Sequence, residues 1–271
     1  MFLNVGNFIK IMEEIAPVKL KQDYDNVGLM VSNTCSEVSS ILVALDCTLE
    51  VIKEAKNKSC SLIISHHPLL FKKPESINYN TLLGRKVIEL IKNDISLYSS
   101  HTNLDIVSGG LNDILVQILG FQNAEVMDTF ENNDRDYNTS GIGRLVTLME
   151  PITLLELCDR VKNTLNIQYL RYSGCEEQLI KRLAVINGSG QDYFKMAKDK
   201  GADCIITGDT SYHYVSDFSE ESLSVIDAGH FATEWPSMKV FASKLQSKLI
   251  QAGFKNVVTI SSKTEDPYKY R

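Results

Sequence analysis

Residues 41–67 read ILVALDCTLEVIKEAKNKSCSLIISHH, and this stretch decides the fold class. Its two ends, residues 41–45 and 61–65, are short continuous apolar runs, which are typical of strands buried on both faces of a parallel sheet. Residues 48–58, between them, have the pattern of a helix. A third apolar run, at residues 95–99, continues the alternation. The pattern predicts an α/β fold with mainly parallel or mixed sheets.

The rest of the chain supplies further elements of both kinds. Helices are predicted at residues 5–16, 81–93, 110–119, 152–165, 192–200 and 235–252. Strands are predicted at residues 141–149, 168–172, 183–186, 204–207, 223–227 and 257–261. Residues 25–31 (DNVGLMV) are interpreted as a polar turn. Residues 121–140 are polar and rich in turn formers, so they are the best candidate for a lobe boundary or a mobile loop.

The two halves of the chain resemble each other. Residues 55–67 (AKNKSCSLIISHH) align without a gap with residues 197–209 (AKDKGADCIITGD), at a constant offset of 142 positions. The same offset places the strand at residues 42–45 over residues 184–187. Strand–helix–strand units also look alike by chance, so this short match supports an internal repeat without proving one.

Two similar α/β lobes are therefore expected. The N-terminal lobe is predicted at residues 1–125 and the C-terminal lobe at residues 126–271, with residues 235–271 able to pack back on the first lobe. Ligands of open parallel sheets bind beyond the C-terminal ends of the strands. Lobes related by a pseudo-twofold axis would bring those strand ends to one cleft, which is where we expect a dinuclear metal site.

Composition and charge exclude several classes of protein. The formal net charge of −6 gives no global basic field to attract nucleic acid, so a nucleic-acid partner is not expected. No run of eighteen or more apolar residues is present, and the N-terminal stretch lacks the features of a signal peptide. The six cysteines form no CxxC pair, which indicates reduced thiols that fill the core. A cytoplasmic protein without a membrane span is expected.

The five histidines mark the candidate site. They lie at or just past the predicted C-terminal ends of strands: His66, His67, His101, His213 and His230. Adjacent residues on a strand point to opposite faces. His66 and His67 can therefore share one metal only where the strand breaks, which Pro68 favours, or else they bind two different metals. The alternative is a pair of capping histidines bonded to nearby carbonyls, an interpretation that weakens for two histidines in an apolar context.

Two carboxylates follow histidines at the same spacing. Asp105 comes four residues after His101, and Glu234 comes four residues after His230. A carboxylate has two oxygens and can bridge two cations. The alternative for Asp105 is a helix cap, and the alternative for Glu234 is an acid favoured by the dipole at a helix start near Trp235.

A further strand, in residues 205–215 (IITGDTSYHYV), leads to Asp209 and His213. These two side chains are candidate acid–base groups beside the site. The alternative is a tight turn that needs Gly208.

The mixture of ligand types points to metal chemistry. Imidazole and carboxylate groups without thiolates suit zinc, iron or manganese. Three histidines and two carboxylates exceed a tetrahedral site with one open position, but they fit two divalent cations ~3.5–4 Å apart with a bridging water. Such a water has a lowered pKa and can attack as hydroxide, with His101 or His213 moving the proton. The proposed ligands are His66, His67, Asp105, His230 and Glu234.

Six motifs occur in one order across nearly the whole chain. They are DNVGLMV (25–31), SHHPLLF (65–71), SHTNLD (100–105), GIGR (141–144), TGDTSYH (207–213) and GHFATE (229–234). Together they resemble the GTP cyclohydrolase 1 type 2 family, also called Nif-three-like dinuclear metal-centre proteins, in its short form. By position, the resemblance assigns the family's metal ligands to the five residues above. His101 matches a histidine near the metals that is not a ligand, and Asp209 stands where relatives are also expected to have Glu.

The resemblance implies two similar lobes, two divalent metal ions per subunit, a ring-shaped homohexamer and hydrolysis of the GTP ring. The residues by themselves indicate only that a hydroxide on two metals could attack an electrophilic carbon or phosphorus. Together with the resemblance, they predict a metal-dependent hydrolase that acts on a nucleotide-like small molecule. No Walker-type loop is present, so phosphates would meet the metals, or Lys72, Lys73 and Arg144, unless these are ordinary surface charges. The alternative is a non-enzymatic metal-binding, regulatory or assembly protein that acts through protein partners. Residues 130–140 could serve as a lid or as a docking surface.

Overall fold

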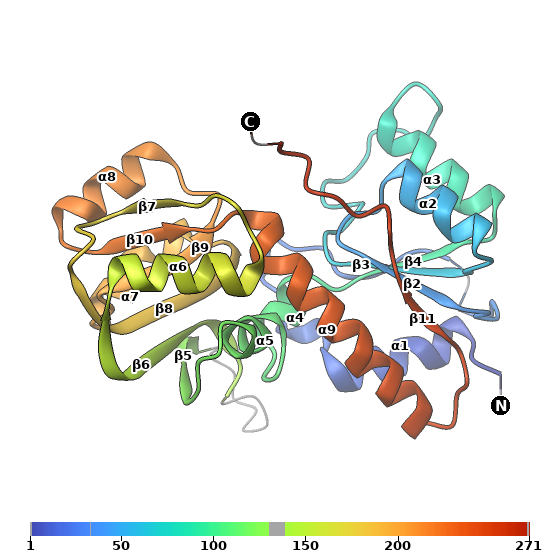
Figure 1. The fold of residues 1–271 in the computed structure, drawn as a ribbon. Helices are drawn as coiled ribbons and strands as arrows, with labels where there is room; N and C mark the ends of the chain where they lie inside the picture. Colours follow the sequence, from blue (N-terminus) through green and yellow to red (C-terminus); the bar gives the residue numbers. More distant parts are fainter. Residues whose placement is uncertain (1, 33, 130–138, 270) are drawn as a thin grey trace. The chain divides into compact units, whose positions relative to one another are not determined.

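The computed structural model describes residues 2–32, 34–129, 139–269 and 271, and the chain forms two compact units (Figure 1). Unit 1 comprises Met1–Leu104 and Met238–Glu265, and unit 2 comprises Asp105–Ser237 and Asp266–Arg271. The two lobes predicted at residues 1–125 and 126–271 remain a prediction. The division into compact units does not show which segments fold on their own.

Unit 1 is built on a five-stranded sheet. Its order is β1 (Gly28–Val31), β4 (Ser96–Ser99), β3 (Leu62–Ser65), β2 (Ile41–Ala44) and β11 (Val258–Ile260). Strands β4, β3, β2 and β11 are parallel, and β1 is antiparallel at one edge. All residues of β2, β3 and β4 are buried, as expected for strands covered on both faces.

Helices cover both faces of this sheet, with α2 and α3 on one side and α1 and the C-terminal part of α9 on the other (Figure 1). The bounds are α1 Val5–Ile15, α2 Leu49–Asn57, α3 Leu82–Lys92 and α9 His230–Gln251, with a short 3₁₀ turn at Val18–Leu20. Threonines begin two of these helices, because the hydroxyl of Thr48 accepts from the amide of Val51 and that of Thr81 from the amide of Gly84.

Unit 2 is built on a six-stranded mixed sheet. Its order is β5 (Ala124–Thr129), β6 (Gly141–Thr153), β8 (Leu179–Ser189), β9 (Cys204–Gly208), β10 (Ser224–Asp227) and β7 (Arg171–Ser173). Strands β8, β9 and β10 are parallel, and the other pairs are antiparallel. The parallel strands form the part of the sheet that leads to the candidate site.

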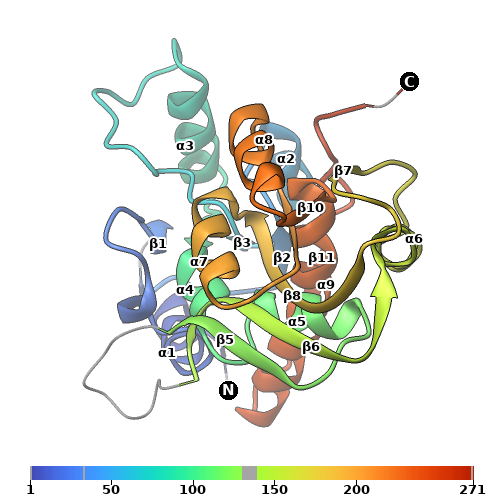
Figure 2. The ribbon, with the colours of Figure 1, turned by 90° about the vertical axis from the view of Figure 1, so that its left-hand side faces the viewer.

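The helices of unit 2 are α5 Leu111–Ile118, α6 Leu154–Leu165, α7 Phe194–Asp199 and α8 Tyr212–Glu220, with a 3₁₀ turn at Gln191–Tyr193 and α4 at Thr102–Ile106 on the boundary of the units. One core joins α5 and α6 to strand residues such as Val185, Ile206 and Ile226. Helices α7 and α8 lie on the other face of the sheet (Figure 2), where Phe194 and Phe218 meet edge to face. Alternation along the strands places Val225 and Asp227 on that second face.

The internal repeat has the same strand pairing in both units. Ile41 pairs with Leu62 in unit 1, and Leu183 pairs with Cys204 in unit 2, so partners in the two sheets differ by the same 142 positions. In each unit a parallel third strand then pairs with the second, on the side away from the first. The alignment of residues 55–67 with residues 197–209 is therefore a structural correspondence.

Several predicted elements were wrong in kind or extent. Residues 28–31, interpreted as part of a turn, form β1, and residues 124–129 form β5 inside the stretch expected to lack structure. Helix α8 was not predicted, and α9 begins at His230 and continues through Pro236, where a start near Trp235 was expected. Strand β6 also runs on to Thr153, so α6 begins two residues later than predicted.

The remaining boundaries agree to within a few residues, except that the strand predicted at residues 168–172 lies at Arg171–Ser173. Most of the candidate lid or docking loop lies outside the described residues. Within the part of the chain that the structure describes, no helix is both long and apolar enough to cross a membrane.

Candidate metal centre

The turns that follow β3 and β4 bring three histidines of unit 1 together. The ring centroids of His66 and His67 lie 5.2 Å apart, and the ring of His101 lies 5.0 Å and 5.6 Å from them. One nitrogen from each ring lies within 4.8 Å of the others. Nitrogens that bind one zinc ion at about 2.1 Å are at most about 4.2 Å apart, so small side-chain rotations would complete a site.

The regular pairing of β3 ends at the two histidines, as is needed if His66 and His67 are to share one metal. The amide of His66 donates to the carbonyl of Ala44, and the next amide, that of His67, donates to the carbonyl of Leu45. Consecutive amides of a regular strand point to opposite sides, so the pleat is interrupted at His67. This interruption allows two adjacent imidazoles to approach one position.

Each of these histidines uses Nδ1 to contact an oxygen. The Nδ1 atom of His66 lies 2.8 Å from the carbonyl oxygen of Ser100, and that of His67 lies 2.9 Å from Oδ1 of Asp46. The carbonyl can only accept, so His66 donates from Nδ1. Metal-binding histidines commonly have this arrangement, because the second bond fixes the ring and its tautomer.

The third histidine is held by a buried carboxylate. The Nδ1 atom of His101 lies 3.0 Å from Oδ1 of Asp25, and Oδ2 of Asp25 accepts from the amide and the hydroxyl of Thr102. Burial alone would raise the pKa of Asp25, but the bonds from His101 and Thr102 outweigh it and lower this pKa to about 2. The carboxylate is therefore ionised at neutral pH and orients His101.

Unit 2 carries the other expected ligands. Helix α9 begins at His230, and its first turns place Nε2 of His230 3.0 Å from Oε2 of Glu234. That separation is one that two ligand atoms on a single cation can have. Glu234 is buried, with 3% of its surface exposed, and burial of a carboxylate is costly without a compensating charge. The pair is chemically suited to hold a cation.

A glycine makes room for this carboxylate. Gly188, near the end of β8, has a φ of +64°, and a Cβ atom there would lie 2.2 Å from Oε1 of Glu234. Its amide donates to the hydroxyl of Thr233 on the same helix. The β8 end and the first turns of α9 therefore fit together only with glycine at this position.

The last expected ligand, Asp105, lies in α4 at the start of unit 2. Its Oδ1 accepts from the side-chain amide of Asn187, and its backbone carbonyl accepts from the side chain of Asn112. Asn112 also accepts from the amide of Asn187, so the three residues form one network. Asn187 belongs to β8 and directly precedes Gly188. The network orients the carboxylate of Asp105.

The two predicted acid–base groups of unit 2 are placed differently. Oδ2 of Asp209 lies 2.8 Å from Nδ1 of His230, so Asp209 orients this histidine as Asp46 orients His67. His213 lies exposed near the start of α8, in ring contact with Tyr212. Asp209 thus adjoins an expected ligand, whereas His213 belongs to a helix with no buried residue.

The three basic residues considered for phosphate binding differ in their exposure to solvent. Arg144 is only 1% exposed, and its guanidinium binds the carboxylate of Asp113 through two bonds and the carbonyls of Gly141 and Gly143 through Nη1. It is neither a surface charge nor a phosphate ligand. Lys72 and Lys73 are exposed.

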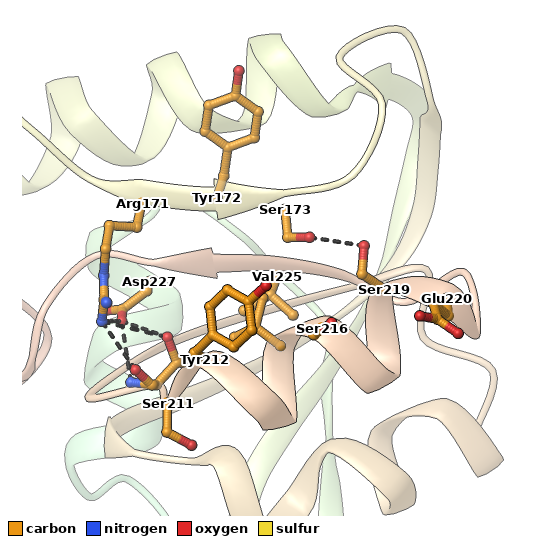
Figure 3. A pocket seen from close by; sticks show the side chains of 12 residues that line it. Arg171, Tyr172, Ser173, Ser211, Tyr212, Ser216, Ser219, Glu220, Val225 and Asp227 are labelled. Atoms are coloured by element: carbon orange, nitrogen blue, oxygen red, sulfur yellow. Dashed lines mark hydrogen bonds and ion pairs between the residues drawn. The ribbon is translucent and has the colours of Figure 1, made fainter.

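A cavity of about 510 Å³ in unit 2 lies between α8 and strands β7 and β10 (Figure 3). At one end Asp227 accepts bonds from Arg171, from the amide and hydroxyl of Thr210, and from the amide of Gly229. Thr210 follows Asp209 and Gly229 precedes His230. The carboxylate of Asp227 therefore joins the two turns that carry the His230–Asp209 pair.

Sequence reasoning missed three positioning residues. Asp25 lay inside the quoted DNVGLMV motif, which was the only available signal for it. Asp46 and Asn187 each follow a predicted strand, but isolated polar residues at such positions are common. Their roles depend on contacts that only the folded chain shows.

Comparison with known proteins places this arrangement in context. The family model described as Duf34/NIF3 (NGG1p interacting factor 3) matches residues 3–267. A GTP cyclohydrolase 1 type 2 homolog of Clostridium acetobutylicum is 52% identical over 271 residues and covers all of both chains. Another, from Clostridium perfringens, is 49% identical over 268 residues and covers 99% of this chain and 100% of the other.

Solved structures share the fold. The crystal structure of the Staphylococcus aureus hypothetical protein SA1388 superposes with a TM-score of 0.91 at 29% identity and covers 99% of each chain. Reduced HcgD from Methanocaldococcus jannaschii superposes with a TM-score of 0.79, also at 29% identity, and covers 96% of this chain and 98% of the other.

Proposed function

The chain belongs to the Duf34/NIF3 (NGG1p interacting factor 3) family, and from that premise we propose that it is a metal-dependent hydrolase with two divalent cations per subunit. The five proposed ligands are His66, His67, Asp105, His230 and Glu234. The single observation that carries the proposal is the orientation of the histidines. Each expected histidine ligand has an oxygen within 2.9 Å of Nδ1, which is the arrangement common among metal-binding histidines.

The donor set fits zinc, iron or manganese, since it combines imidazoles with carboxylates and contains no thiolate. When bound, a pair of such cations supplies a water molecule that is acidic enough to act as a hydroxide nucleophile near neutral pH. The protein's own part is to fix the ligands before the cations arrive, which the carboxylates of Asp46 and Asp209 and the carbonyl of Ser100 do.

His101 is our candidate for proton transfer. Its ring lies among the histidines of unit 1, and Asp25 holds its Nδ1. A histidine oriented by an ionised carboxylate is the usual arrangement of a general base, because the carboxylate stabilises the imidazolium that forms. Asp209 and His213 stay secondary candidates for the same role.

The substrate class we propose is a nucleotide-like small molecule. The names of the curated relatives refer to GTP cyclohydrolase, and ring opening of that kind needs a water to attack a ring carbon. Hydrolysis by this chain is thus our proposal, and a metal-binding regulatory or assembly protein that acts through protein partners is the competing one. We also propose a cytoplasmic, ring-shaped homohexamer, which light scattering of the purified protein would test.

The first experiment measures the metal content of protein purified without a histidine tag. We expect about two metals per subunit. We expect less metal in His67→Ala and in Glu234→Ala. His213→Ala is the matched control, because it removes an exposed histidine of α8, and we expect it to keep its full metal content. Formate release from GTP, followed by a phosphoester and amide panel, is assayed on the same samples.

The whole proposal would be supported if the two ligand variants lose both the metal and the hydrolytic activity that the wild-type protein has. Metal without hydrolysis of any compound would favour the non-enzymatic alternative. Less than about half a metal per subunit, unchanged in the variants, would show that the histidines are structural.

A further inference from the structure

Two exposed aromatic rings lie beside the histidines of unit 1, and we propose that they form a stacking platform for a planar heteroaromatic ring of the substrate. The aromatic platform consists of Tyr24 and Phe71. The inference rests on the proposed function, because it takes the histidine cluster as the place of reaction. It adds the residues that would recognise the ligand.

The platform is continuous with the histidine cluster. The ring centroids of Tyr24 and Phe71 lie 6.4 Å apart at an interplanar angle of 71°, and Phe71 and His101 lie 6.5 Å apart at 84°. Both are edge-to-face contacts within the range that aromatic pairs prefer. Phe71 therefore contacts both Tyr24 and His101, so a ring that covers Phe71 would lie near the candidate proton-transfer group.

Both rings remain open to solvent. Tyr24 is 67% exposed and Phe71 is 44% exposed, although their side chains are among the largest apolar surfaces of unit 1. Neighbouring exposed aromatics are a feature of binding sites, since they gain free energy only when a ligand covers them. A base or another flat heterocycle suits such a surface, because every base has a π-face that stacks on aromatic rings.

Hydrogen bonds fix the segments that carry the platform. Asn26 donates from its side chain to the carbonyl of Leu70, 2.6 Å away, and so joins the two segments next to the two rings. Asp25, which follows Tyr24, binds His101 through its carboxylate and accepts from Lys21 at its carbonyl. The platform is thus tied to the cluster before any ligand binds, which lowers the ordering cost of binding.

Two lysines follow the platform in the sequence. Lys72 and Lys73 directly follow Phe71, and both are exposed. In a chain with a formal net charge of −6, these two ammonium groups provide a local site for an anion. A flat ring joined to a phosphate would satisfy both features, so the ligand class indicated is a nucleoside phosphate.

The test compares a ligand that carries a heteroaromatic base with one that lacks the base. Binding of guanosine 5′-monophosphate and of ribose 5-phosphate is measured by titration calorimetry on the purified protein. Because base stacking contributes about tenfold or more in affinity, we expect the nucleotide to bind at least about tenfold more tightly than the sugar phosphate. Equal affinities would overturn the inference.

Variants assign the effect to the platform. Phe71→Leu should weaken the binding of guanosine 5′-monophosphate by about tenfold and leave the binding of ribose 5-phosphate unchanged. Phe71→Trp should keep the wild-type affinity for the nucleotide. Ile77→Ala, which changes another exposed apolar side chain of the same loop, is the matched control and should have no effect. Replacing Lys72 and Lys73 together by alanine should reduce nucleotide affinity towards that of guanosine.

Metal content measured on the same samples separates this inference from the proposed function. A Phe71→Leu protein with full metal and unchanged nucleotide affinity would disprove the platform and leave the metal site intact. A wild-type protein that lacks metal but still prefers the nucleotide, with loss of the preference in Phe71→Leu, would support the platform and reject the hydrolase proposal.

Discussion

Four histidines at the candidate site share the same hydrogen-bonding arrangement. His66, His67, His101 and His230 each place Nδ1 within 3.0 Å of an oxygen, and three of these oxygens belong to carboxylates. Such partners raise the basicity of the imidazole and fix its direction. The residues that orient the ligands should therefore matter almost as much as the ligands.

Removing one orienting carboxylate should weaken metal binding without unfolding the protein. In Asp46→Asn, His67 loses its charged partner, and we expect metal affinity to fall by about 10–100-fold. A competition titration against a chelator measures this change. Glu50→Gln, at an exposed residue of helix α2, is the control and should keep the wild-type affinity. Equal affinity of Asp46→Asn and wild type would refute the orienting role.

Gly188 allows a second prediction at this scale. In Gly188→Ala the new methyl group would clash with Glu234, and a positive φ costs roughly 1–2 kcal/mol for a residue with a Cβ atom. We expect a larger loss of stability than that, together with loss of metal. Gly201→Ala is the matched control, because Gly201 has a φ of +77° but nothing within 4 Å of an added Cβ.

Urea unfolding and metal analysis of the two glycine variants would separate strain from collision. If both lose the same stability and both keep their metal, the close fit of Glu234 against β8 has no importance for the site.

The sequence indicated ligand types at the residue scale but not their partners. His66 and His67 were visible because they end an apolar strand, and Glu234 was visible because it follows His230 at the spacing at which Asp105 follows His101. Asp46 and Asn187 were invisible, because a polar residue near a strand end has no distinguishing pattern until the fold places it beside a particular ring or carboxylate. Arg144 was misjudged for the same reason, since its partner Asp113 lies 31 positions away.

Continuous apolar runs made the buried elements predictable. Strands β2, β3, β9 and β10 were found within one or two residues, and the repeat gave the correct correspondence between the two units. Helix α8 was missed because it buries no residue and so has no apolar stripe. The start of α9 was missed because Pro236 normally indicates a helix boundary, whereas here burial of Trp235, Met238 and Phe241 outweighs one lost hydrogen bond.

Helix α2 is joined to the end of β11 through a buried acid. Glu54 accepts bonds from Lys58, from Ser261 and from the amide and hydroxyl of Ser262. Burial opposes ionisation of Glu54, but these bonds lower its pKa from 4.5 to about 2. A depressed pKa means that the ionised carboxylate stabilises the folded state, fully above pH 4.5 and progressively less as the pH falls towards 2.

We expect Glu54→Gln to be less stable than wild type by roughly 2–4 kcal/mol at pH 7, since each unit of pKa shift corresponds to about 1.4 kcal/mol. The difference should shrink as the pH falls from 4.5 towards 2, because wild type then loses the same contribution. Urea unfolding of both proteins at pH 7, 4 and 3 measures it. A difference that is independent of pH would contradict the role of the charge.

At the scale of the whole molecule, unit 1 is discontinuous in sequence. Its sheet ends in β11, and α9 contributes Met238 and later residues, so unit 1 needs residues from both ends of the chain. The chain passes between the units inside α4, inside α9 and again after Glu265, and the expected ligands Asp105 and Glu234 lie in α4 and α9. The sequence analysis allowed for residues 235–271 to return to the first lobe.

Truncation tests this organisation. A chain that ends at Ser237 lacks β11 and most of α9, and we expect it to be aggregated or protease-sensitive in unit 1. A chain that ends at Glu265 keeps both elements and is the control, which we expect to retain the wild-type circular dichroism spectrum and melting temperature. Limited proteolysis with mass spectrometry identifies the digested segment. A well-folded unit 1 in the shorter chain would overturn the prediction.

The position of β11 also has a consequence for synthesis on the ribosome. Strand β2 emerges early, but its neighbour β11 at Val258–Ile260 is translated more than two hundred residues later. At about 5–20 residues per second, the nascent chain carries the open side of β2 for on the order of ten seconds or more. An uncovered strand invites pairing with another chain. Chaperone demand should therefore be greatest in the interval before the last strand leaves the exit tunnel.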